Sequence, residues 1–234
     1  RDQNRTSRLA STIFGIVLAA LSLSSCESIY EDLAPCSHGV SLRFVYDYNM
    51  EFADAFPSQV NDVMLFIFDD DGRFISSLQD SGPHLDAGYR MPLQLVPGHY
   101  QLVAWAGLLT DTDCYNLNCD LQRGTSTVDD LMLCLQTEED EYDQCLTDVW
   151  HGQLADFEVK ADAPSYATIS LVKDVKRFRV LLQDTEGNAL SKDDYSFGIT
   201  TANRMLDHQN EPCECEPLVY RPHTLVEATI SNDA

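Results

Sequence analysis

The chain has 234 residues, of which 44% are hydrophobic and 23% are charged, and this composition excludes a disordered protein. Its length suffices for one large domain or two small ones. The formal net charge of −23 argues against nucleic acid as a partner, because a polyphosphate is bound by a clustered positive surface.

The first 25 residues have the plan of a secretory signal peptide. Arg1, Arg5 and Arg8 precede an apolar run at 13–23, which is too short to be a stable membrane anchor. Two small residues, the second of them Ser25, then follow as expected at a cleavage site. We therefore expect export of the chain, with cleavage between Ser25 and the next residue, a cysteine.

Cys26 is the expected site of lipid attachment. Leu23-Ser24-Ser25-Cys26 resembles a lipobox, the bacterial signal for adding diacylglycerol to the thiol, cutting before the cysteine and acylating the new amino group. Several acyl chains anchor a protein firmly, since each buried methylene contributes about 0.8 kcal/mol. Residues 26–35 would then be a lipidated tether. The alternative is an ordinary signal peptide or a short transmembrane helix in which Cys26 is incidental.

Three stretches with apolar residues at every second position predict β-strands. Residues 40–48 alternate as a half-buried strand does. Residues 60–78 predict a hairpin around 70–72, because an Asp-Gly pair tolerates the positive φ of a tight turn. Residues 91–107 predict two further strands joined at a Pro-Gly turn. Short strands at this spacing predict an all-β sandwich domain over residues 36–160.

A helix and a second sandwich are expected in the rest of the chain. Residues 125–136 predict a helical insertion, because the Ser-Thr pair at 126–127 is a suitable N-cap. Residues 161–234 predict a second β-sandwich, with a long alternating strand over 175–182 and a turn at 186–188. This part is shorter than the about 100 residues of a complete seven-stranded sandwich, so we expect the second domain to be incomplete.

Several segments together resemble a known family. The lipobox is followed, in order, by "LRFVYDYN" (42–49), "VNDVMLFIFDDDGRFI" (60–75), "LVPGHYQLVAWAGL" (95–108), "DVWHGQL" (148–154) and "ISLVKDVKRFRVLL" (169–182). This set resembles the FimB-type, or Mfa-like, fimbrial minor-subunit and anchor lipoproteins of Bacteroidetes. Lys173 stands where the family has a lysine in the first strand of the second domain.

The resemblance implies a fold and a mechanical function. It implies two tandem transthyretin-like β-sandwich domains in a lipoprotein of the outer membrane, exposed at the cell surface. Such a protein anchors a fimbria (pilus), contributes to cell adhesion and limits fibre length. The implied partners are fimbrial shaft subunits, contacted through strands, and the outer membrane, reached through the lipid on Cys26. The acidic residues Glu27, Glu31 and Asp32 resemble a surface-display signal of Bacteroidetes lipoproteins.

The cysteines after Cys26 are candidates for disulfides, because export takes a chain to an oxidising compartment. Cys114 and Cys119 flank one short loop, and Cys134 and Cys145 flank another. Either pair can close locally, or the two loops can be cross-linked. A metal or redox site is the alternative, but the zinc-ligand spacing of paired CxxC motifs is absent.

No sequence motif supports catalysis or a cofactor. The histidines lack HxxxH and HExxH spacing, and nucleophile-elbow, P-loop and dinucleotide-binding motifs are absent. We therefore expect no enzyme, no catalytic residue, no metal and no cofactor. Trp105 is expected in the core. The alternative function is a surface lipoprotein that binds glycan or another small ligand, with Trp150 and Tyr142 lining the site.

Overall fold

The computed structural model describes residues 39–227, apart from 110–113, 119 and 138. The strands in this part of the chain are β1 (Val40–Val45), β2 (Asp62–Asp69), β3 (Phe74–Ser81), β4 (Met91–Leu93), β5 (Gly98–Ala106), β6 (Tyr115–Asn118), β7 (Met132–Leu135), β8 (Glu141–Tyr142), β9 (Trp150–Val159), β10 (Ser165–Ser170), β11 (Val172–Lys173), β12 (Ile199–Thr201), β13 (Met205–Leu206) and β14 (Leu218–Tyr220). Helical elements in the same residues are short: α2 (Phe56–Gln59) and the 3-10 turns η1 (Val128–Asp130) and η2 (Lys192–Asp194). The predicted all-β class is confirmed.

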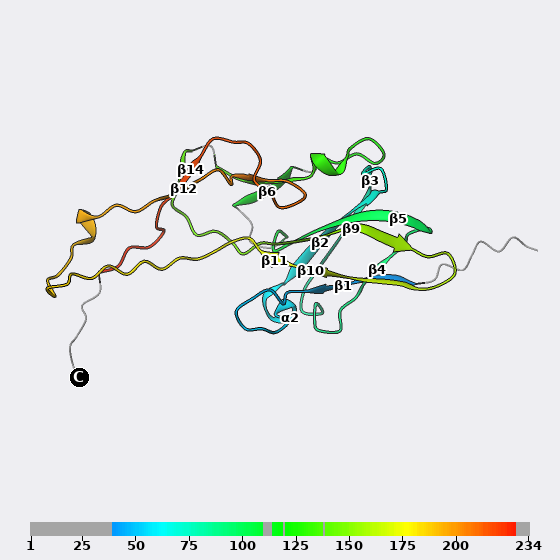
Figure 1. Ribbon diagram of the computed structural model, residues 1–234, viewed down its shortest axis with the longest axis horizontal. Coiled ribbons are helices and arrows are strands. Elements are labelled where there is room, and N and C mark those ends of the chain that lie inside the picture. The colour runs from blue at the N-terminus through cyan, green and yellow to red at the C-terminus, as the bar shows by residue number, and fades with distance from the viewer. Residues whose placement is uncertain (1–38, 110–113, 119, 138, 228–234) are drawn as a thin grey trace, which may run out of the picture. The chain divides into compact units, whose positions relative to one another are not determined.

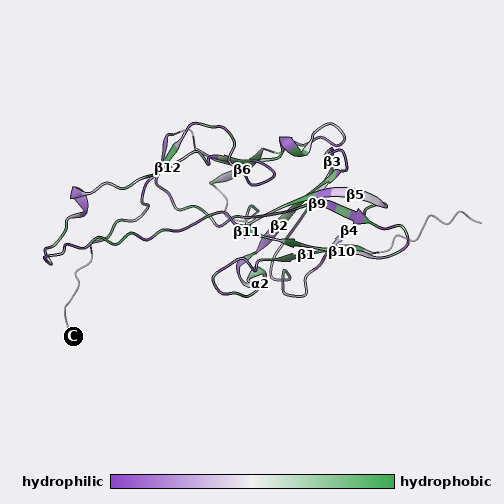
Figure 2. Cartoon of the chain, viewed as in Figure 1, coloured by the Kyte–Doolittle hydropathy of each residue, from purple (hydrophilic) through white to green (hydrophobic). Residues whose placement is uncertain are grey.

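Two sheets pack face to face as a sandwich. One has the strand order β10-β1-β4 and the other the order β11-β9-β5-β2-β3. Alternate residues of each strand point inward, so Leu42 and Phe44 from the first sheet meet Leu65, Ile67 and Leu102 from the second in one buried cluster. Figure 1 shows β1, β4 and β10 on one side of β2, β5 and β9, and β1 is mostly hydrophobic in Figure 2.

Strand β1 lies at the centre of the three-stranded sheet. It pairs in parallel with β10, with Val40 opposite Ser165 and Val45 opposite Ser170. On its other side it pairs antiparallel with β4, with Leu42 opposite Met91. Removing β1 would therefore leave two strands without a common partner and open the core between them.

The predicted hairpin at 60–78 is confirmed as β2 and β3. Gly72 has φ 74°, and its N–H donates to the carbonyl oxygen of Asp69 at 2.9 Å, which closes the turn. The turn predicted at Pro97-Gly98 does not join two strands of one hairpin. The chain at Pro97-Gly98 leaves β4 in one sheet and enters β5 in the other, so these two strands do not form a hairpin with each other.

A second apolar layer covers the other face of the five-stranded sheet. Phe66 and Trp105 point to this face and pack against Leu131, Leu133 and Val175. Trp105 is fully buried, which confirms its predicted place in the core. Leu133 belongs to β7 in the small sheet with the strand order β13-β7-β6, and Leu131 directly precedes β7.

The prediction of a helix at 125–136 is wrong beyond its first turn. Thr127, one of the two expected N-cap residues, forms a capping box with Asp130, but it closes only the 3-10 turn η1. Leu131, Leu133 and Leu135 are buried while the residues between them are less so, which is the two-residue period of a strand. Burial against the five-stranded sheet thus favours β7 over continuation of the helix.

The sheets of the sandwich continue past the expected domain boundary at residue 161. β10 pairs with β1, and β11 pairs with β9. Later strands join segments that precede the boundary: β13 pairs with β7, and β14 with β8. The observed pairings fit a first sandwich that extends to Lys173. The division into domains at 36–160 and 161–234 stays a prediction.

The strand predicted over 175–182 is not formed in the structure. In Figure 1 the chain between β11 and β12 carries only the turn η2. Val175 is buried, but the residues after it expose their side chains and have no partner strand among the described residues. An alternating pattern gives a strand only where a neighbouring strand accepts its backbone hydrogen bonds. A turn forms close to the one predicted at 186–188, but it spans 184–187, where Gly187 N–H donates to the carbonyl oxygen of Asp184 at 3.2 Å.

Candidate functional site

The predicted lipidation and cleavage residues, Cys26 and Ser25, lie outside the described residues. Both assignments therefore stay predictions. Among the residues that the structure describes, no helix is long and apolar enough to cross a membrane. Within the same ranges, no group of three His, Cys, Asp or Glu side chains is arranged to hold a metal ion.

The described members of the predicted disulfide set are free thiols. Cys114 is buried, and its Sγ lies 3.0 Å from Oγ1 of Thr147. Cys134 is held in β7, and burial raises the pKa of its thiol. Cys145 is exposed in a loop, so a Cys134–Cys145 bond is not formed in the structure. Cys119 lies outside the described residues, and its pairing stays a prediction.

An ion cluster on Asp148 fixes the point where the chain leaves the sandwich. Lys173 Nζ lies 2.6 Å from Oδ2 of Asp148, and the guanidinium of Arg177 lies 2.9 Å from Oδ1. Lys173 Nζ also lies 5.2 Å from the ring centroid of Trp150, within the range of a cation–π contact. The ammonium group thereby links the residues at the start of β9 to the end of β11.

The backbone beside this cluster is tightly packed. Gly107 has φ 81°, and a Cβ at this position would overlap the carbonyl oxygen of Asp148. The fully buried Asp62 accepts hydrogen bonds from Gly107 N–H at 2.8 Å and from Leu108 N–H at 2.9 Å. Only glycine fits both the conformation and the close approach, so the end of β5 is held against the segment before β9 that carries Asp148.

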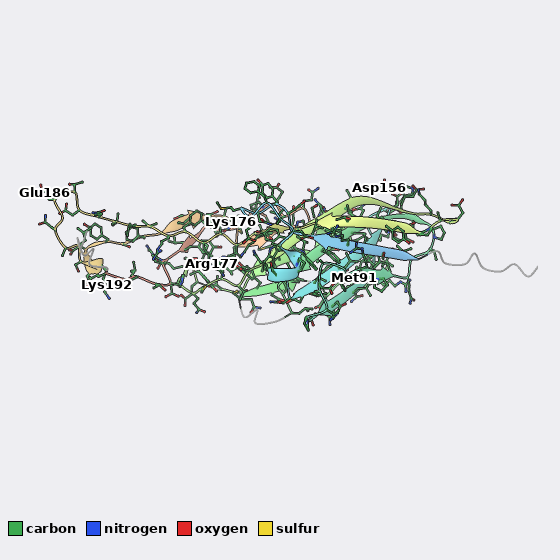
Figure 3. All side chains as sticks on the ribbon, turned by 90° about the horizontal axis from the view of Figure 1, so that it is seen from below. Met91, Asp156, Lys176, Arg177, Glu186 and Lys192 are labelled. Carbon is green, nitrogen blue, oxygen red and sulfur yellow. The ribbon has the colours of Figure 1, made fainter. Side chains whose placement is uncertain are left out.

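The residues after this cluster form an exposed apolar segment, 177–182. Phe178 is 75% exposed, Val180 67%, Leu181 76% and Leu182 46%. Figure 3 labels Lys176 and Arg177 close together where the segment starts. In Figure 2 the segment alternates between hydrophobic and hydrophilic colours. Contiguous exposed apolar side chains indicate a surface that contacts another chain.

A cavity of about 330 Å³ lies beside the start of this segment. Its apolar lining includes Leu133, Val175, Phe178 and Ile199. Asp174 also lines it and accepts a 2.6 Å hydrogen bond from the side-chain amide of Asn210. Burial raises the pKa of Asp174 from 3.8 to about 7. The cavity and the 177–182 segment together form an apolar surface that an added side chain or strand could occupy.

The aromatic residues proposed for a glycan site are not available for it. Trp150 is 3% exposed and packs edge-on against Tyr46 at a centroid distance of 6.0 Å. Tyr142 is 9% exposed and packs against Tyr220. The alternative function therefore loses the residues that the sequence suggested for it. Asp148 and Gly107 stand in two of the segments that carry the family resemblance, but sequence reasoning missed their contact, which forms only through the fold.

Comparisons with known proteins identify the family. The model of the fimbrillin-A associated anchor proteins Mfa1 and Mfa2 matches residues 33–232. A solved structure of a candidate polysaccharide binding protein from Bacteroides thetaiotaomicron is 33% identical, with a TM-score of 0.71, and the match covers 80% of this chain and 66% of that one. A candidate adhesin from the same species is 32% identical, with a TM-score of 0.69 and coverage of 82% and 64%.

The fimbrial anchor protein Mfa2 from Porphyromonas gingivalis has the same fold, with a TM-score of 0.60 at 18% identity over 79% of this chain and 66% of that one. The chain thus spans about two thirds of the length of these solved structures. A search of curated proteins gives no significant match. The family match extends over most of the sequence, and the chain belongs to the family of fimbrillin-A associated anchor proteins Mfa1 and Mfa2.

Proposed function

We propose that the chain is a surface lipoprotein that anchors a fimbria to the outer membrane and limits the length of the fibre. The observation that carries the proposal is the match of the anchor-protein family to residues 33–232. The family and its neighbours support a fimbrial anchor or surface adhesin role and a location in the cell envelope. It is a family of structural proteins rather than of enzymes.

The position of β1 supports a role in limiting fibre length. In assembly by strand exchange, a subunit lacking one strand accepts a strand from its neighbour. The sandwich of this chain keeps β1 as the central strand between β10 and β4. Its core is therefore already filled, with Leu42 and Phe44 buried. A subunit with no open groove at this end terminates the fibre there.

Contact with the shaft would be made far from β1 in the sequence, through the 177–182 segment. This segment exposes apolar side chains and has no partner strand among the described residues. Its backbone N–H and C=O groups are available to pair with a strand from another chain. Arg177 and Arg179 interrupt the apolar side chains and favour an approaching strand with acidic residues.

The lipid on Cys26 would supply the hold on the membrane. With a net charge of −23 the chain is repelled by an anionic surface, so electrostatic attraction does not keep it there. Covalent acyl chains act independently of this repulsion. The anchor's resistance to detachment then depends on one covalent modification and on the packing of the sandwich.

A strain that carries the Cys26→Ala variant tests the proposal. We expect loss of labelling with radioactive palmitate and transfer of both the protein and the fimbriae from the cell pellet to the medium. The matched control is Cys145→Ala, which removes an exposed thiol and should leave labelling and fimbriae unchanged. Retained palmitate on the Cys26→Ala protein would refute the lipid assignment, and fimbriae that stay on the cells would refute the anchor.

A further inference from the structure

The outer face of the sheet β10-β1-β4 carries a groove that the anchor function does not use. The groove has a volume of about 470 Å³ and is lined by Ser41, Arg43, Arg90, Tyr166, Ala167 and Thr168. Most of these are polar side chains, in contrast to the apolar residues on the inner face of the same strands. The groove is also separate from the 177–182 segment, which does not line it.

Strand register brings the polar residues together. Ser41 of β1 lies opposite Tyr166 of β10, and Arg43 lies opposite Thr168. These residues alternate with the buried Leu42 and therefore point to the outer face.

The second arginine, Arg90, directly precedes β4, the strand on the other side of β1. β1 and β4 pair Leu42 with Met91, so the next residues along the two strands are Arg43 and Arg90. Met91, which follows Arg90 in the chain, is labelled in Figure 3. Arg43 of β1 and Arg90, the residue directly before β4, thus line one groove.

The charges of this groove are opposite to those of the chain as a whole. Arg43 has one carboxylate partner, Asp54, at 3.1 Å. Arg90 donates to the carbonyl oxygen of Tyr89 at 2.7 Å, and no carboxylate lies within ion-pair distance of it among the described residues. Like charges on neighbouring strands cost free energy, which a bound anion would offset. A carboxylate is a suitable anion, because guanidinium groups bind it with two parallel hydrogen bonds.

The remaining groups of the groove suit a carbohydrate. Tyr166 is 72% exposed and presents an aromatic face with a polar tip. The hydroxyl groups of Ser41 and Thr168 both donate and accept hydrogen bonds, as sugar hydroxyls require. An acidic peptide is favoured less, since an added peptide strand binds at a sheet edge through its backbone, whereas this groove crosses the face.

We propose that this face is a binding site for an acidic carbohydrate. The carboxylate of a uronic or sialic acid lies between Arg43 and Arg90, the sugar ring stacks on Tyr166, and the sugar hydroxyls hydrogen-bond to Ser41 and Thr168. This inference goes beyond the anchor function and does not depend on it. It gives the chain a means of adhesion to acidic surface glycans.

Isothermal titration calorimetry of the purified full chain in detergent tests the site. The probes are an octamer of galacturonic acid, its methyl ester, and a decamer of glutamic acid. We expect the acidic octamer to bind at least about tenfold more tightly than either of the others, and its binding to weaken as salt is added. Equal binding of the methyl ester or of the peptide would overturn the proposal. So would failure to bind the octamer, an alginate oligosaccharide and sialyllactose alike.

Variants test the residues. R43Q combined with R90Q should weaken octamer binding by about tenfold or more, as expected for loss of charge-assisted hydrogen bonds. Y166A should weaken binding of the acidic octamer to a smaller extent. The matched control is R177Q, which removes an arginine outside the groove and should leave binding unchanged. Because R43Q also breaks the pair with Asp54, the exposed R90Q alone is measured beside it, with melting temperatures for all variants. Unchanged binding in folded R90Q protein would overturn the proposal.

Discussion

The ammonium nitrogen of Lys173 lies 2.6 Å from Oδ2 of Asp148, across 25 residues of sequence. The side chain of Lys173 is 17% exposed and that of Asp148 is 26% exposed, so both charges are largely removed from water. Arg177, the first residue of the exposed segment, reaches the other oxygen of the same carboxylate. Asp148 therefore ties the last strand of the sandwich to the residues that we propose contact the shaft.

Replacing Asp148 by Asn should destabilise the fold. The change removes the negative charge that both Lys173 and Arg177 use, and it leaves a half-buried ammonium group without its counter-ion. We expect the free energy of unfolding to fall by about 2 kcal/mol, between the values for surface and buried pairs. Urea denaturation measures it. R177Q is the control, because its side chain is 59% exposed and its loss should matter much less. Equal effects of the two substitutions would contradict this account.

Gly107→Ala should be more damaging than the same change at Gly124. Both glycines have positive φ, 81° and 74°, so each alanine adds backbone strain. At Gly107 the new methyl group would also overlap the carbonyl oxygen of Asp148, whereas nothing lies within 4 Å at Gly124. We expect about 1 kcal/mol for Gly124→Ala and at least about twice that for Gly107→Ala. Thermal melts that rank the variants in the opposite order would refute the close approach.

Asp174 should make stability depend on pH. Its pKa is raised by burial from 3.8 to about 7, so the folded state holds its proton where the unfolded state has lost it. The stabilisation is therefore complete below about pH 4 and is lost as the pH rises through 7.

The variant Asp174→Asn isolates this effect. Relative to the wild type, it should gain about 4 kcal/mol in the free energy of unfolding between pH 4 and pH 8. His151, whose pKa burial lowers to about 4, acts in the opposite direction but is present in both proteins. Urea titrations at four pH values measure the difference. Parallel pH profiles for the two proteins would show that Asp174 is not buried as described.

Acidic substitutions in the 177–182 segment should separate assembly from folding. Phe178→Asp and Val180→Asp change exposed side chains, so we expect melting temperatures close to that of the wild type. A carboxylate in place of an apolar side chain should weaken contact with the strand of a shaft subunit, and fewer fimbriae should remain on the cells. Val96→Asp is a control, because Val96 is 72% exposed in a loop of the sandwich. Normal fimbriation in both segment variants would remove this segment from the assembly surface.

The sequence predicted the sandwich well because alternation and turn chemistry are local signals. The hairpin of β2 and β3 follows from a turn residue that tolerates positive φ between two apolar runs, although β2 is buried at nearly every position because both faces of its sheet are covered. β7 was mistaken for a helix because a cap at Thr127 precedes it, and only the sheet beneath decides between the two periods. The strand expected at 175–182 does not form. Its residues alternate as those of a strand do, but no strand among the described residues accepts its backbone hydrogen bonds.

The candidate sites were less predictable because they join distant residues. Arg43 and Arg90 become neighbours only through the register of β1 with β4. Asp148 and Lys173 meet only because β9 and β11 pair. Trp150 was a candidate lining residue of a glycan site, yet its side chain is buried against Tyr46. In each case the information lies in strand pairing, which the spacing of residues in the sequence does not report.

Immunogold electron microscopy of intact cells tests the central claim most directly. An antibody against this chain is applied to cells that carry fimbriae, and the position of each gold particle along the fibre is recorded. An anchor held by the membrane and in contact with the first shaft subunit predicts gold at the cell-proximal end of the fimbriae. Gold spread along the shaft, at the distal tip, or on the surface away from fimbriae would contradict it.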